Sequence, residues 1–166
     1  MPPSSDNPAP PSSPVCAADA GSDAYMNRVE PAELVEFLNQ LLEAERAGTR
    51  VARESRAQCI TAPERQLMVD IHGDEARWCK MLIEAIPRLG GAPSLRVGDF
   101  YPRAMAIADL DERLRFLNRG QGWVAKRLGE MIPRVADSAL RTELAAMREN
   151  HDANIARVNR FLDERR

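Results

Sequence analysis

Large apolar residues recur every three or four positions along four long stretches of the chain, separated by polar positions. A repeat of this length is typical of amphipathic helices, each with one buried face. The pattern predicts helices over residues 31–58, 61–89, 109–131 and 137–162, and no part of the chain shows the strict alternation of a strand. We therefore expect an all-α protein.

Local signals support the predicted helix ends. Thr61 is followed three residues later by Glu64, and Asp109 likewise by Glu112, a spacing typical of helix N-termini. Asp137 is a further candidate N-cap. The glycine pair at positions 90–91 suits a left-handed C-terminal cap.

The connections predict how the helices are arranged. The first and last connections are short, which makes each joined pair of helices an antiparallel hairpin. The middle connection has about 18 residues and no clear helical period. A 25-residue helix is about 37 Å long, whereas 18 extended residues reach roughly 60 Å. The segment is therefore long enough to cross the whole bundle, which predicts an up-down-down-up four-helix bundle.

Each apolar stripe is interrupted once near its middle by a polar residue: Glu45, Glu75, Gln121 or His151. If the four stripes face one another, these side chains meet in one layer halfway along the bundle. Burying such a layer costs free energy unless its members satisfy one another or hold a ligand. The layer is therefore the candidate site.

Over residues 31–162 the chain resembles the ferritin-like superfamily, in particular its rubrerythrin-like and bacterioferritin-like members. The resemblance implies the same bundle with its long crossover. Those families bind two irons or manganeses with one Glu from each of the first and third helices and a Glu-x-x-His motif from each of the others. In this chain Glu45, Glu75 and His151 match the corresponding ligands in residue type.

The other three ligand positions depart from the family pattern. Trp78 stands in place of the second-helix His, Gln121 in place of the third-helix Glu, and Arg148 in place of the fourth-helix Glu. Four buried carboxylates would need cations for balance. Here only two remain, and Arg148 with a protonated His151 would balance them without metal. This charge count predicts a polar core layer in which the dinuclear site has degenerated.

Two functions follow from this layer. The first is a non-catalytic structural or binding module. The alternative is a metal-binding oxidoreductase or metal-storage protein in which Glu45, Glu75 and His151 hold Fe or Mn. His72 lies one turn before Glu75 and would complete a mononuclear site if it pointed inward rather than to solvent. Whether the protein is an enzyme stays open.

Composition limits the other interpretations. Residues 1–28 are rich in proline, serine and alanine, which predicts a disordered tail before a single domain over 29–166. The net charge of −2 gives no reason to expect nucleic acid as a partner. No apolar run is long enough for a membrane span. Long amphipathic bundles often pair through an outer face, so a homodimer is the partner that we consider.

The cysteines bear on the compartment. Cys16, Cys59 and Cys79 are an odd number and lack Cys-x-x-Cys spacing, which favours a reducing environment over a disulfide framework. The N-terminal residues show neither the basic nor the apolar region of a secretory signal. We therefore expect a cytoplasmic protein.

Overall fold

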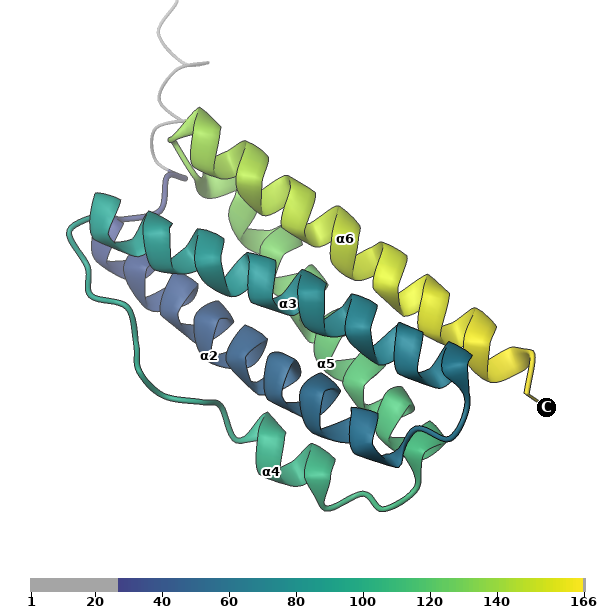
Figure 1. The fold of residues 1–166 in the computed structure, drawn as a ribbon. Coiled ribbons are helices and arrows are strands. Elements are labelled where there is room, and N and C mark those ends of the chain that lie inside the picture. Colours follow the sequence, from purple (N-terminus) through teal and green to yellow (C-terminus); the bar gives the residue numbers. More distant parts are fainter. Residues whose placement is uncertain (1–26, 166) are drawn as a thin grey trace, which may run out of the picture.

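A computed structural model describes residues 27–165, which form four long helices packed as two antiparallel pairs (Figure 1). The helices are α2 (Pro31–Ser55), α3 (Ala62–Arg88), α5 (Leu110–Met131) and α6 (Ser138–Asp163). Short 3₁₀ turns, η1 (Arg56–Gln58) and η2 (Ile132–Arg134), extend the ends of α2 and α5. The all-α prediction is confirmed, and the four helices match the predicted ranges to within a few residues. Of the tail predicted over residues 1–28, residues 1–26 lie outside the described part of the chain.

The chain runs up-down-down-up, as the length of the middle connection predicts. α2 and α3 form one hairpin, and α5 and α6 form the other; between them the chain returns along α2 to the opposite end of the bundle (Figure 1). The prediction that this crossover lacks helical structure is wrong in one place. A short helix, α4 (Phe100–Met105), forms there and contacts both α2 and α5. None of the described helices is both long and apolar enough to cross a membrane.

The polar caps at the helix ends lie where the sequence predicts them. The Thr61 hydroxyl accepts a hydrogen bond from the Glu64 backbone N–H, while the Glu64 carboxylate accepts one from the Thr61 N–H at 2.8 Å. Asp109 and Asp137 accept hydrogen bonds from the first-turn N–H groups of α5 and α6. Gly90 ends α3 with a φ of 79°, a conformation that glycine adopts without a steric penalty.

The hydrophobic core consists of two separate clusters. One fills the end of the bundle where α2 begins and α3 ends, and the other fills the opposite end. Along each long helix the gap between the two clusters contains a buried polar residue: Glu45, Glu75, Gln121 or His151. The predicted layer therefore exists, and it separates two apolar regions.

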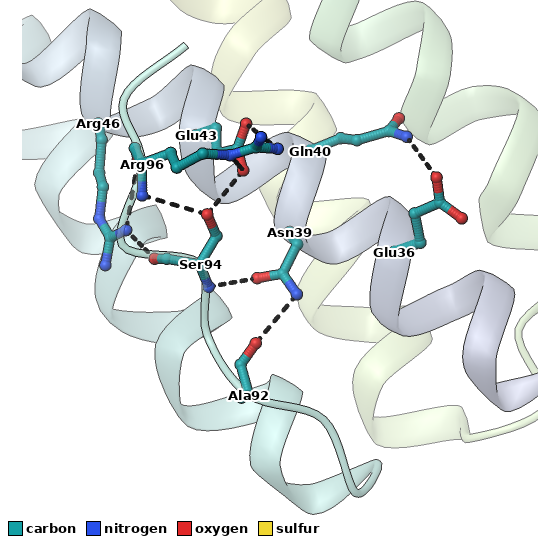
Figure 2. A network of polar contacts seen from close by, with 8 residues as sticks. All are labelled: Glu36, Asn39, Gln40, Glu43, Arg46, Ala92, Ser94 and Arg96. Carbon is teal, nitrogen blue, oxygen red and sulfur yellow. Dashed lines mark hydrogen bonds and ion pairs between the residues drawn. The ribbon is translucent and has the colours of Figure 1, made fainter.

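Polar contacts hold the crossover against α2 (Figure 2). The Asn39 amide donates to the Ala92 carbonyl at 3.1 Å and accepts from the Ser94 N–H at 2.7 Å. One turn later, Glu43 accepts from the Ser94 hydroxyl at 2.6 Å and pairs with Arg96 at 3.0 Å. These contacts join residues about 50 positions apart in the chain, so they fix the course of the crossover before it enters α4.

We predict that Asn39→Ala loosens the crossover, because it removes a donor and an acceptor that each serve the crossover backbone. Losing two such hydrogen bonds should lower the free energy of unfolding by about 1–3 kcal/mol. Asn39→Asp separates the two bonds: it keeps the acceptor for Ser94 but turns a second acceptor toward the Ala92 carbonyl, so it should also destabilise the protein. Chemical denaturation measures both, and equal stability of all three proteins would contradict the role given to Asn39.

Candidate metal centre

Three side chains with metal-binding atoms converge midway along the bundle. Glu45 comes from α2, Glu75 from α3 and His151 from α6, and their exposed fractions are 0%, 4% and 1%. One potential ligand atom from each lies within 4.8 Å of the other two. We call these three residues the trio. No other group of this kind occurs among residues 27–165.

The orientation of His151 is set at both ring nitrogens. Nδ1 lies 2.9 Å from the Met147 carbonyl oxygen, which can only accept, so Nδ1 carries the proton and donates. Nε2 lies 3.2 Å from Glu45 Oε1 and faces the interior of the trio. A histidine anchored to a carbonyl through one nitrogen presents the other as a ligand, the arrangement common to metal-binding histidines.

Burial controls the protonation of the two acids. It raises the pKa of Glu45 from 4.5 to about 8, even though a hydrogen bond with Glu75 acts in the opposite direction. The pKa of Glu75 rises well above 4.5, first through burial and then through the nearby charge of Glu45; His151 offsets part of this rise. In the absence of a cation the pair therefore retains protons at neutral pH, and one carboxyl group donates to the other.

Gly48 gives the Glu75 carboxyl group its space. A methyl group at position 48 would lie 2.5 Å from Glu75 Oε2 and 2.8 Å from its carboxyl carbon. Glycine in a helix interior costs roughly 1 kcal/mol relative to alanine, and this close approach explains the residue. By contrast, Gly73 and Gly122 have nothing near the position of a Cβ atom.

Several polar atoms of the layer lack a hydrogen-bond partner. They are Glu45 Oε2 and both amide atoms of Gln121, all fully shielded from solvent. Buried polar atoms without partners are uncommon and destabilising. Gln121 comes from α5, so every long helix contributes to the layer, but its amide bonds to none of the trio. Its amide oxygen is an uncharged group that could coordinate a cation.

Arg148 is not part of the layer, so the predicted charge balance is wrong. Its side chain is exposed and lies across α5 at Gly129, where a methyl group would be 3.1 Å from the guanidinium. The buried stripe of α6 includes Leu144, Met147 and His151. Because Met147 takes the inward position one turn before His151, Arg148 is rotated out of the core. The two acids are therefore buried without a guanidinium.

The remaining candidates also lie outside the trio. His72 is half-buried on α3 and does not join the trio, so the condition for a fourth ligand, an inward-pointing His72, is not met. Trp78 is buried, as expected, and its Nε1 donates to Asn150 at 2.7 Å. Burial raises the pKa of the Cys79 thiol to about 11 and also raises that of Cys59, so neither is an activated nucleophile. Cys16 lies outside the described residues.

A cavity of about 540 Å³ opens beside the trio. α2, α5 and the crossover with α4 form its wall, and all three members of the trio and Gln121 line it. Its apolar wall includes Phe100 and Phe116, whose rings stack with centroids 4.7 Å apart. Gly120 admits the Phe100 ring, because a methyl group there would lie 2.7 Å from it. The wall of this cavity depends on the placement of α4, which the sequence did not predict.

Comparisons with known proteins agree with this architecture. A crystal structure described as that of ferritin-like, diiron-carboxylate proteins from Bacillus anthracis str. Ames superposes with a TM-score of 0.71. The match covers 80% of this chain and 96% of that chain at 21% identity, which shows that the two share the ferritin-like fold. No curated protein matches the chain. A family model described as "Domain of unknown function (DUF6306)" matches residues 32–160, so the chain belongs to the DUF6306 family.

Proposed function

We propose that this protein binds one divalent iron or manganese ion through Glu45, Glu75 and His151. The observation that carries the proposal is the pair of acids buried side by side, with the His151 imidazole against Glu45 and no lysine or arginine among the described residues paired with either acid. Burial of such a pair is costly in the absence of a counter-charge. A divalent cation supplies that charge and also gives Glu45 Oε2 a partner.

The donor set fits one ion. Bonds from carboxylate oxygen or imidazole nitrogen to such a metal are about 2.1 Å long, so donors on opposite sides are about 4.2 Å apart. The ligand atoms of the trio already lie within 4.8 Å of one another. Two carboxylates and one imidazole form a mixed O/N set suited to Fe(II) or Mn(II). One divalent ion balances two carboxylates, whereas two ions would leave an excess positive charge in an apolar bundle.

Such an ion would bring redox and Lewis-acid chemistry to the floor of the cavity. The protein's contribution would be to hold the ligands and exclude bulk water: His151 is fixed by the Met147 carbonyl, and Gly48 leaves room for Glu75. Three protein ligands leave coordination positions free for solvent or a small molecule. The diiron-carboxylate description of the structural neighbour supports metal binding in this fold, but half of the superfamily's ligand positions hold other residues here.

The second candidate is a non-catalytic structural module that binds no metal. The observation in its favour is that the trio forms hydrogen bonds of its own, from Glu45 to His151 at 3.2 Å and between the two acids. Against it, Gln121 and Glu45 Oε2 remain without partners. Metal binding distinguishes the two functions.

We predict that metal-free protein binds one equivalent of Mn(II) or, without oxygen, Fe(II). At a free concentration a hundred times Kd, binding should stabilise the fold by about 2.7 kcal/mol. Glu45→Gln and His151→Ala should remove this effect, because each deletes a ligand. Arg148→Gln is the control and should bind as the parent does. Calorimetry measures the binding of the metal, and thermal unfolding measures the stabilisation that it causes. No binding, or binding unaffected by Glu45→Gln, would favour the structural module.

We predict that the stability of the metal-free protein falls as the pH rises from 5 to 8. The folded state holds a proton on Glu45 up to about pH 8, whereas the unfolded chain releases it near 4.5. Stability is therefore lost through this interval, at most about 1.4 kcal/mol per pH unit for one proton. Glu45→Gln should flatten the slope in urea denaturation. Mn(II) affinity should rise over the same interval, because the metal displaces that proton; a slope that Glu45→Gln leaves unchanged would contradict the assignment.

We predict that Gly48→Ala weakens metal binding by about tenfold or more, because the added methyl group displaces the Glu75 carboxyl group. Gly73→Ala on α3 is the matched control, since nothing lies near its Cβ position. It should leave metal affinity unchanged and stabilise the helix by up to about 1 kcal/mol. Calorimetry with Mn(II) measures affinity and denaturation measures stability. Equal metal affinity in the two variants would show that the space at Gly48 is not required.

A further inference from the structure

Two arginines with no acidic partner face the same aromatic ring at the wall of the cavity. Arg103, on α4, places its guanidinium carbon 5.4 Å from the centre of the Phe116 ring, and Arg119, on α5, places its own at 5.2 Å. Both residues line the cavity and both are exposed. Neither forms an ion pair with any residue of the described chain. Two like charges brought to one ring create a local positive potential that favours an anion.

We propose that the cavity binds a small aromatic monocarboxylate. Its carboxylate pairs with Arg103 and Arg119, and its ring lies against the Phe100–Phe116 stack, directed toward the trio. Guanidinium groups bind carboxylates through charge-assisted hydrogen bonds. The binding of the anion depends only on the cavity wall, whereas its approach to a metal ion rests on the proposed function.

The walls select the kind of anion. Phe100, Phe116 and Trp123 all line the cavity, and flat rings pack favourably against aromatic side chains. The volume of about 540 Å³ lies within the range of small-molecule sites. Glu43 and Asp99 also line the cavity, and only Glu43 is paired, with Arg96. This remaining negative charge disfavours di- and trianions, so a single carboxylate suits the site better than a phosphate.

The fold brings the two arginines and the two stacked phenylalanines to one side of the same cavity. α4 contributes Arg103 and Phe100, while α5 contributes Arg119 and Phe116. Gly120 on α5 allows the Phe100 ring to approach, which brings α4 against α5 and closes one side of the cavity. The trio lies in the wall of the same cavity. A ligand anchored by its carboxylate to the two arginines therefore directs its other end into the space that the trio borders.

The experiment titrates the full-length protein with 3-phenylpropionate by calorimetry, with and without Mn(II). The neutral 3-phenylpropionamide and the non-aromatic 3-cyclohexylpropionate are the matched ligands. We expect the carboxylate to bind about tenfold or more tightly than the amide, and several-fold more tightly than the cyclohexyl compound. The double variant R103Q/R119Q should lose about tenfold in affinity for 3-phenylpropionate, while Arg160→Gln, an exposed arginine of α6 outside the cavity, should not.

The outcomes separate this proposal from the metal proposal. R103Q/R119Q should retain the parent's Mn(II) affinity, because neither arginine belongs to the trio. If Mn(II) binds at the trio, it should broaden the ligand's ring proton NMR signals in the parent protein, and Glu45→Gln should abolish the broadening. Ligand binding without Mn(II) binding would overturn only the proposed function. No binding of 3-phenylpropionate, equal binding of the amide, or undiminished affinity in R103Q/R119Q would overturn the aromatic carboxylate site.

Discussion

The burial of two carboxyl groups beside one imidazole is the constraint on which the rest of this structure depends. Glu45 and Glu75 lie between two apolar clusters, where ionised acids are costly without a counter-charge. The surroundings accommodate the acids: Gly48 makes room for one, and His151, held by a backbone carbonyl, faces the other. A core selected only for stability would fill this level with apolar side chains. The layer is therefore the feature on which the proposed metal binding rests.

The bundle could be predicted well from the sequence because its signals are local and repetitive. The stripes follow helical spacing, and the caps at Thr61, Asp109 and Asp137 depend on neighbours within three residues. Even the crossover followed from its length alone. α4 was missed because six residues containing Pro102 are too few to show a period.

The candidate site was only partly predictable, for two physical reasons. Positions 147 and 148 lie four and three residues before His151, so spacing alone allows either to face inward. The structure buries Met147 and exposes Arg148, and the expected charge balance fails for that reason. The same ambiguity affects the next turn, where Asn154 is buried and Ile155 is only partly buried. The wall of the cavity was not predictable, since it depends on contacts between α4 and distant parts of α2 and α5.

The two halves of the candidate site come from different parts of the fold. The trio belongs to α2, α3 and α6, whereas much of the cavity wall belongs to α4, α5 and the crossover, which polar contacts tie to α2 (Figure 2). Sequence change in the crossover can therefore reshape what enters the cavity without moving the trio. Such a division makes the protein a suitable scaffold for grafting. Crossover segments of different sequence could be exchanged while the trio stays constant.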